Sequence, residues 1–166
     1  MKRTIRIALA TAGLCAAMCT GVSAQNAKDI VGAWETTSIT SERADGSKFS
    51  PITGRLKGLV VFTSDGHFSQ HNVNLDMPKI AANNRQQSTA EENKAIMQGS
   101  YALFGRYTVD ETDHTLAIQI EGSSFPNEIG KSQKRPFTLS GDQLTFVNPA
   151  PPSGGKGAVN VLKRAR

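Results

Sequence analysis

The chain has 166 residues, which is enough for one compact domain and hardly enough for two. Its formal net charge is +5, but three of its 19 basic residues, Lys2, Arg3 and Arg6, lie in an amino-terminal segment that has the features of an export signal. Without them, 16 basic residues stand against 14 acidic ones, and the net charge falls to +2. This small charge, together with export, argues against a nucleic-acid-binding protein.

The first 24 residues have the three parts of a cleavable secretory signal peptide. Basic residues come first, an apolar run spans residues 7–22, and Val22-Ser23-Ala24 is a typical cleavage pattern. The run is interrupted by Thr and Gly residues and is shorter than the roughly 20 residues that a transmembrane helix needs. We therefore predict cleavage after Ala24, a mature domain of residues 25–166, a periplasmic or secreted location, and no membrane span after cleavage.

Both cysteines, Cys15 and Cys19, lie inside the predicted signal peptide. The mature chain is therefore expected to contain no disulfide and no thiolate metal site, so its stability must come from packing. His67 and His71 are four residues apart on one predicted strand, or about 13 Å at roughly 3.3 Å per residue, too far to bind one metal ion together. The third histidine, His114, lies in a predicted turn, and we expect neither a metal ion nor a cofactor.

The first predicted strand carries the only tryptophan of the chain. Four residues share one face of this extended segment by alternation: Ile30, Trp34, Thr36 and Ser38. Gly32 permits a close bend that lets the indole ring of Trp34 cover one end of a barrel. The alternative is a core tryptophan on an ordinary edge strand.

Two predicted strands form a hairpin around the Asp65-Gly66 turn signal. They span residues 59–63 and 67–73. In the second of them, alternate residues share a face, which groups His67, Ser69, His71 and Val73 on one side and Phe68, Gln70 and Asn72 on the other.

Residues 74–99 interrupt the strand pattern with a predicted helix. Thr89 and Glu92 have the spacing of a capping box, in which each side chain bonds to the backbone N–H of the other, and Gly99 is a typical helix stop. The apolar stripe between them is too narrow for a core helix. We predict a short helix that lies over one mouth of a barrel.

The second half of the chain shows the clearest strand alternation. Its predicted strands span residues 101–109, 115–121, 133–139, 143–147 and 158–163. With the strands before them, the total is about eight, joined by short turns, with one helix and no β-α-β unit. This pattern predicts an all-β fold, an antiparallel up-and-down barrel with one short helix near a barrel mouth.

Several motifs occur in the order and spacing of a known family. They are Ile30-Val31-Gly32-Ala33-Trp34, the Thr-x-Asp-Gly turn at residues 63–66, the capped helix from Thr89, Gly105-Arg106-Tyr107, and above all Glu121-Gly122-Ser123-Ser124-Phe125-Pro126-Asn127. On these motifs the chain resembles the lipocalin-like domain family of small bacterial and fungal barrel proteins. The resemblance covers nearly the whole predicted mature chain and makes the predicted barrel a lipocalin-like one.

The resemblance also implies how one end of the barrel is closed. In this family the Gly-x-Trp strand closes one end, and a basic residue near the carboxyl terminus stacks on the tryptophan, a role open here to Lys163 or Arg164 above Trp34. The chain departs from the family pattern at two places. Ile118-Gln119 stands where relatives often have a histidine pair, and Glu128 stands where they often have an aromatic residue, so a site shared at those positions would be altered here.

Our leading hypothesis is a barrel that binds a small, mostly apolar molecule in its interior. The predicted apolar walls are Phe62, Phe68, Phe104 and Ile118, with Leu116 and Ile120 beside them. Polar orientation of the ligand is assigned to His71, Arg106, Glu121 and Asn127, because strand ends and loops carry most binding groups. Each has a structural alternative: a solvent-facing His71, a Glu121 that pairs with Arg106 or Arg135, and a turn-forming Asn127.

Two other classes of function stay open at this point. One is an isomerase or cyclase that uses Glu121 or His71 as its single proton-transfer group, since such chemistry needs positioning more than a nucleophile. The other is a barrel filled by its own side chains that serves as an envelope or interaction module, with the loop at residues 149–157 as a contact surface. The chain contains no nucleophile elbow, phosphate loop or dinucleotide fingerprint, so binding of a small hydrophobic ligand is favoured over catalysis.

Overall fold

A computed structural model describes residues 27–166, so the predicted signal peptide and its cleavage site lie outside the described residues. The strands are β1 (Gly32–Glu42), β2 (Lys48–Phe49), β3 (Leu56–Phe62), β4 (His67–Asn74), β5 (Ser100–Asp110), β6 (Thr115–Ser123), β7 (Ser132–Ser140), β8 (Gln143–Asn148) and β9 (Ala158–Arg164). The helices are α1 (Ala27–Ile30) and α2 (Ala90–Gly99), with short 3₁₀ turns η1 (Arg85–Gln87) and η2 (Pro126–Glu128).

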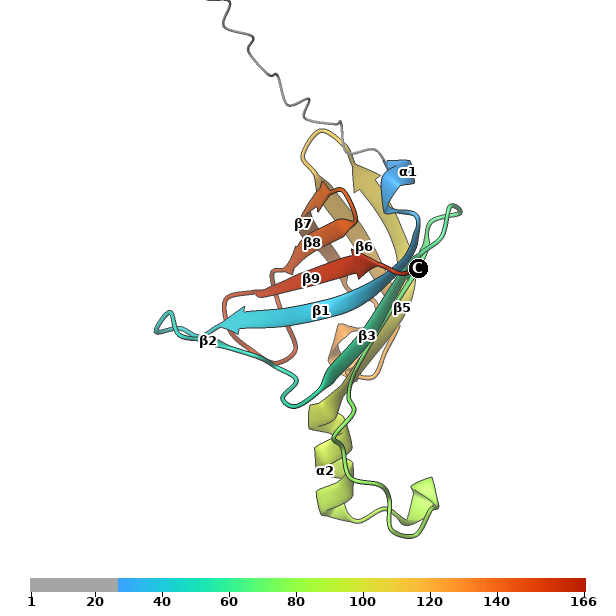
Figure 1. Ribbon diagram of the computed structural model, residues 1–166, viewed down its shortest axis with the longest axis vertical. Helices are drawn as coiled ribbons and strands as arrows, with labels where there is room; N and C mark the ends of the chain where they lie inside the picture. Colours follow the sequence, from blue (N-terminus) through green and yellow to red (C-terminus); the bar gives the residue numbers. More distant parts are fainter. Residues whose placement is uncertain (1–26) are drawn as a thin grey trace, which may run out of the picture.

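The strands form one antiparallel sheet that closes on itself. Their order is β2-β1-β3-β4-β5-β6-β7-β8-β9, and β1 pairs with β9 as well as with β3 (Figure 1). β2 is a short extra strand that pairs only at the end of β1, through Ser41 and Glu42. The closed ring therefore has eight strands, and the predicted up-and-down barrel is confirmed. Closure satisfies the backbone groups that an open sheet would leave at its edges.

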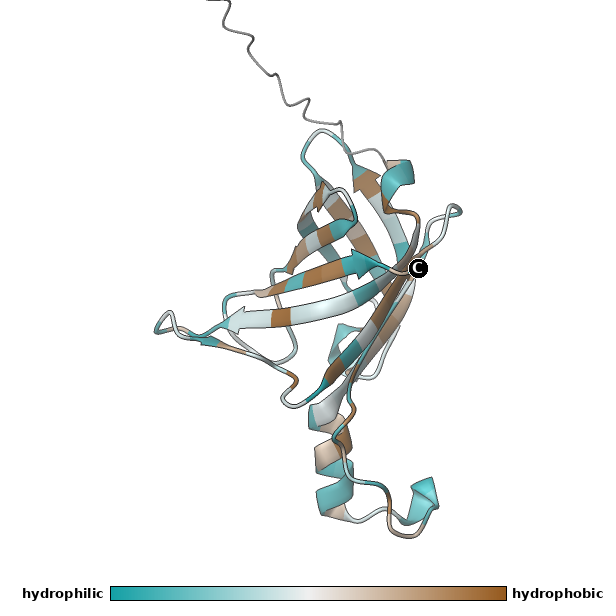
Figure 2. Cartoon of the chain, in the orientation of Figure 1, coloured by the Kyte–Doolittle hydropathy of each residue, from teal (hydrophilic) through white to brown (hydrophobic). Residues whose placement is uncertain are grey.

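Side chains alternate between the barrel interior and the outer surface, which appears as bands of contrasting hydropathy along the strands (Figure 2). On β4, Phe68, Gln70 and Asn72 are buried while His71 is exposed, so the two faces predicted for this strand are confirmed. On β1 the prediction for Ser38 is wrong, because Ser38 is exposed. A register shift between Thr36 and Ser38 in the pairing with β9 breaks the simple alternation there.

One end of the barrel is closed by an apolar cluster around the tryptophan. Trp34 is fully buried, and its indole N–H donates to the backbone oxygen of Ile30 at 2.8 Å. The guanidinium carbon of Arg164 lies 4.1 Å from the centroid of the Trp34 ring, and the same guanidinium donates to the backbone oxygens of Asp29 and Val31. Lys163, by contrast, is exposed.

Gly32 is required at this closed end. Its φ of +129° lies in a region that side-chain-bearing residues rarely adopt, and a Cβ there would lie 3.2 Å from Nη1 of Arg164. The glycine before the tryptophan therefore gives the chain its bend and leaves room for the arginine that covers the ring.

The helix α2 begins with the predicted capping box. Oγ1 of Thr89 accepts from the backbone N–H of Glu92 at 3.2 Å, and Oε2 of Glu92 accepts from the backbone N–H of Thr89 at 2.8 Å. α2 lies at a barrel mouth, as predicted, but most of it extends away from the strand ends (Figure 1). None of the helices described in residues 27–166 is long and apolar enough to cross a membrane.

Candidate functional site

The inward-facing positions change character from one end of the barrel to the other. Along β4 the buried residues run from Phe68 to Gln70 and Asn72, and along β9, read backwards, they run from Leu162 to Asn160. Most of the buried apolar residues lie toward the Trp34 end and the polar ones toward the end that carries α2, where Ala158 of β9 and Ile39 of β1 are apolar exceptions. Because buried polar groups are costly unless they are hydrogen-bonded, a polar half of a barrel interior is a candidate site.

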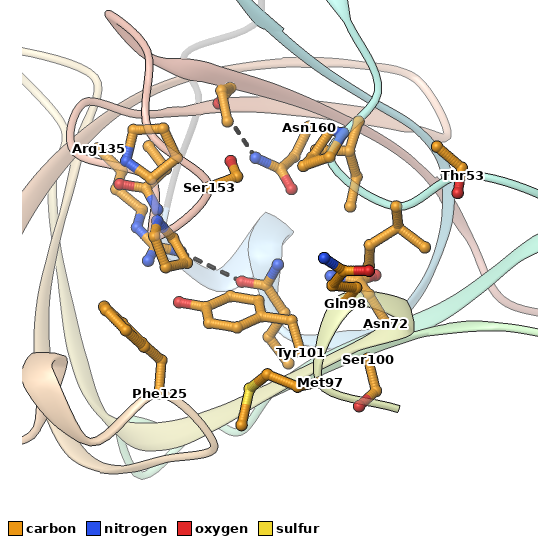
Figure 3. A pocket seen from close by; sticks show the side chains of 18 residues that line it. Thr53, Asn72, Met97, Gln98, Ser100, Tyr101, Phe125, Arg135, Ser153 and Asn160 are labelled. Atoms are coloured by element: carbon orange, nitrogen blue, oxygen red, sulfur yellow. Dashed lines mark hydrogen bonds between the residues drawn. The ribbon is translucent and has the colours of Figure 1, made fainter. Parts of the chain in front are cut away.

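A cavity of about 540 Å³ opens at this polar end. Its apolar walls include Ile39, Ile52, Met97, Phe125, Pro151 and Ala158. Its polar lining includes Gln70, Asn72, Tyr101, Arg135, Asn148 and Asn160, and Figure 3 shows labelled side chains of both kinds around one central space. The volume is within the range of roughly 300–1,000 Å³ that is typical of small-molecule sites.

Arg135 on β7 is the charged residue of the cavity lining. It is only 1% exposed, and its Nε and Nη2 donate to Oε1 of Gln133 at 3.0 and 2.8 Å, while its Nη1 donates to Oε1 of Gln70 at 3.2 Å. The Phe146 ring centroid lies 5.5 Å from the guanidinium carbon. Among the described residues, none of the ion pairs within 4.0 Å includes Arg135. Its charge is therefore solvated by neutral amide oxygens.

Glu128, in η2, is a buried carboxylate close to this arginine. Its Oε2 accepts from the hydroxyl of Tyr101 at 2.6 Å, and its Oε1 accepts from Nε2 of Gln133 at 3.4 Å. Gln133 thus lies between the two charges, with its amide oxygen toward Arg135 and its amide nitrogen toward Glu128. This is the position at which the chain departs from the aromatic residue common in the family it resembles.

The electrostatics of the cluster follow from burial. Burial raises the pKa of Tyr101 well above its ordinary value, and the hydrogen bond and negative charge of Glu128 raise it further. Burial lowers the pKa of Arg135, while its interactions with Tyr101 and Glu128 oppose that effect. Tyr101 therefore stays a neutral phenol that donates to Glu128, and it does not release its proton at neutral pH.

A second polar corner lies in the wall of the cavity, where β1, β3 and β4 meet. Asn72 is 0% exposed, and within residues 27–166 neither polar atom of its amide has a hydrogen-bond partner. Oγ1 of the buried Thr36 is likewise unpartnered there. A Cβ at Gly58, which pairs with Asn72 across the strands, would collide with both side chains, coming within 2.6 Å of Oγ1 of Thr36. Glycine at this position therefore makes the space that the polar corner occupies.

The polar residues predicted to orient a ligand lie on the outside. His71 is exposed and its Nε2 lies 2.6 Å from Oγ of Ser69. Nε of Arg106 lies 3.6 Å from Oε1 of Glu121, with both side chains about half exposed, so Glu121 pairs with Arg106 and not with Arg135. Asn127 is exposed at η2. These four residues do not line the cavity.

The residues predicted as apolar walls divide into two groups. Phe62, Phe68 and Ile118, with Leu116 and Ile120, belong to the buried cluster at the Trp34 end. Phe104 points outward and is 54% exposed. Neither group lines the cavity. The predicted set combined both faces of single strands, such as Phe68 with His71, and only one face of a strand can point into a barrel.

The residues that do line the cavity carried a signal in the sequence. Gln70 and Asn72 share the strand face of Phe68, and Asn160 shares that of Leu162. A polar residue that shares a strand face with buried apolar residues also points into the interior of the barrel. It is therefore a better candidate for an interior site than a polar residue on the opposite face. The loop residues of the lining, such as Phe125 and Pro151, have no comparable signal.

The histidines do not gather into a metal site. Nδ1 of His67 lies 3.2 Å from Oδ1 of Asp65 in the β3–β4 turn, and in the described part of the chain no group of three or more His, Cys, Asp or Glu side chains is placed to hold a metal ion. His114 packs edge-on against the ring of Phe137, with 6.2 Å between the ring centroids.

A closed antiparallel barrel of eight strands, with a tryptophan-capped end and a cavity at the other end, is a lipocalin-type architecture. The sequence model of the lipocalin-like domain family matches residues 31–165, and the chain belongs to this family. The resemblance seen in the sequence is therefore confirmed. A search of curated proteins finds no match to the chain.

Proposed function

We propose that this protein binds a small, mostly apolar molecule in the cavity at the α2 end of its barrel. The observation that carries the proposal is the 540 Å³ cavity within a lipocalin-like barrel, with apolar walls and a few polar groups aimed into it. A barrel of the same architecture filled by its own side chains would not have this space. The volume therefore supports ligand binding over the interaction-module alternative.

The cavity lining has an apolar part and a polar part, and this arrangement supports an amphipathic ligand. Ile39, Ile52 and Ala158 form a small apolar cluster near the mouth, and Phe125 and Met97 add apolar surface. The polar groups of Arg135 and Asn72 are more deeply buried. A ligand would place its apolar body against the mouth and its polar end inward.

The enzymatic alternative gains no support from the residues first proposed for it. Glu121 and His71 are exposed on the outer surface and have partners there, Arg106 and Ser69. Neither is positioned to move a proton on a molecule inside the barrel. Binding without chemistry is the proposal that the cavity supports best.

We also propose that the protein acts after export, in the periplasm or outside the cell. This rests on the predicted signal peptide and its cleavage pattern at Ala24. The intact mass of protein from its natural host tests it: a chain that begins at Gln25 is expected, and an uncleaved chain in the cytoplasm would contradict it.

Binding can be measured with N-phenyl-1-naphthylamine, a neutral apolar dye whose fluorescence rises in a dry site. We expect saturable binding of about one dye per protein. The variant Ser153→Trp places a large side chain at an exposed loop position of the cavity lining, so it should weaken dye binding by about 10-fold or more without disturbing the barrel.

Ser140→Trp is the matched control, because Ser140 is exposed at the end of β7 and does not line the cavity. It should bind the dye as the unmodified protein does. Absence of saturable dye binding, or equal binding by both tryptophan variants, would show that the cavity is not the binding site.

A further inference from the structure

The lining of the cavity carries one charge, and that charge is positive. Of the lining residues, Arg135 alone is ionised at neutral pH, since Tyr101 is a phenol held by Glu128. Glu128 itself does not line the cavity and meets Arg135 only through Gln133 and Tyr101. A molecule inside the cavity is therefore adjacent to a guanidinium whose nearest counter-charge lies behind two neutral side chains.

Arg135 retains hydrogen-bonding capacity toward that molecule. A guanidinium has five N–H donors, and the bonds to Gln133 and Gln70 use three of them. The phenol oxygen of Tyr101, which influences the pKa of Arg135, can accept a fourth. At least one N–H on a terminal nitrogen is thus available to a ligand, on a side chain that is itself only 1% exposed.

A buried cation without a direct acidic partner favours an anionic ligand. Removing a charge from water is costly, and amide oxygens compensate the cost less completely than a carboxylate does. A single positive charge matches a monoanion, and the planar guanidinium matches the planar carboxylate in geometry. The same reasoning gives no advantage to a neutral ligand of equal size.

Asn72 adds a second recognition point. It is two residues from Gln70 on the inward face of β4, or about 7 Å along the strand, and both polar atoms of its amide are unpartnered among the described residues. Its amide can donate to and accept from a hydroxyl, carbonyl or amide group on a ligand whose carboxylate is held at Arg135.

We infer that the cavity is a site for an amphipathic monocarboxylic acid, with Arg135 binding the carboxylate and the apolar chain lying along Ile39, Ile52 and Phe125 toward the mouth. This inference rests on the proposed function and names the chemical class of its ligand. Asn72 is assigned to a second polar group near the carboxyl end of that ligand.

Displacement of N-phenyl-1-naphthylamine separates the two proposals, because binding of this neutral dye tests the cavity alone. The competitors are dodecanoate, dodecan-1-ol and methyl dodecanoate at pH 8 and below their aggregation limits, so that they differ in charge and share one chain length. We expect dodecanoate to displace the dye at a concentration about 10-fold to 100-fold lower than either neutral competitor, the range expected for a buried charge-assisted hydrogen bond.

Three substitutions locate the preference for the carboxylate. Arg135→Met removes the charge and keeps a long side chain, and it should abolish the advantage of dodecanoate over dodecan-1-ol. Lys134→Met is the control, because Lys134 is the adjacent residue of β7, exposed on the opposite face, and the advantage should persist. Arg135→Lys retains the positive charge but not the planar guanidinium with its paired N–H donors, so this variant should keep part of the advantage of dodecanoate.

The outcomes are distinguishable. If the dye binds and dodecanoate competes no better than the neutral molecules, the inference about the carboxylate is overturned and the proposed cavity function stands. If the dye does not bind at all, both fail. The comparison of competitors uses the unmodified protein, so it decides the question even if Arg135→Met does not fold. A preference for dodecanoate that Arg135→Met leaves unchanged would place the anion elsewhere on the protein.

Discussion

The two ends of this barrel are made by the same strands and have opposite chemistry. At one end, Trp34, Leu116 and Leu162 belong to a dry apolar cluster that Arg164 covers from outside. At the other end, the strands contribute Asn72 and Arg135 to an open cavity. A single strand such as β4 takes part in both, because its inward residues change from apolar to polar along its length.

The contrast indicates that the two ends of the barrel contribute differently to its stability. Apolar burial at the tryptophan end contributes most of the stability, at roughly 25 cal/mol per Å² of apolar surface removed from water. The cavity end keeps unpartnered polar atoms and empty volume, which both reduce stability. Such a cost is expected at a binding site and is consistent with the ligand binding proposed above.

The largest effect is expected at the tryptophan end. Trp34→Ala removes a fully buried side chain from the main cluster and should lower the free energy of unfolding by about 3–5 kcal/mol. Ile52→Ala, in the small cluster beside the cavity, should cost about 2 kcal/mol or less, because fewer buried residues pack against it. Urea unfolding measures both. A loss at Ile52 equal to that at Trp34 would refute the division between the two ends.

An intermediate effect is expected from the arginine that covers the tryptophan. Arg164→Met removes the guanidinium over the ring and its hydrogen bonds to two backbone oxygens, and it should lower the free energy of unfolding by about 1–3 kcal/mol. Lys163→Met, at the exposed neighbouring position, should change it by less than about 0.5 kcal/mol. Equal urea midpoints for the two variants would show that Arg164 does not seal this end.

The smallest effect is expected at the cavity end and has the opposite sign. Asn72→Leu replaces a buried, unpartnered amide by an apolar group of similar size, so the ligand-free protein should gain about 1 kcal/mol. Asn148→Leu is the matched control, because Oδ1 of Asn148 accepts from the backbone N–H of Ala150 at 3.1 Å, and it should lose about 1 kcal/mol. Thermal unfolding of the ligand-free variants tests this pair. A loss at both positions would mean that Asn72 has a structural role.

The barrel could be predicted from the sequence because the patterns that indicate it each lie within a short segment of the chain. Turn signals such as Asp65-Gly66 and the capping box of Thr89 each fix a short segment, and alternation fixes which residues share a face. Strand number and order then follow from the short connections. Family motifs added the identity of the barrel type.

The site was harder to predict because it depends on how distant strands come together. Arg135, Gln70 and Glu128 are neighbours only after β4, β7 and η2 are assembled. Two register irregularities, on β1 at Thr37 and on β6 at Glu121, also interrupt the regular pairing, and the one on β1 changes which residues face inward. Candidates such as His71 and Arg106, chosen from polarity and position, lie on the outer surface because they occupy the strand face opposite to that of the buried residues beside them.

The bridging amide of Gln133 has one further consequence. Its oxygen faces Arg135 and its nitrogen faces Glu128, so rotating the amide by half a turn would set N–H against N–H on one side and oxygen against oxygen on the other. The amide dipole therefore has a single compatible orientation. In this orientation the side chain of Gln133 separates the Arg135 guanidinium from the Glu128 carboxylate, so the two do not form a direct ion pair. The guanidinium of Arg135 remains directed toward the interior of the barrel.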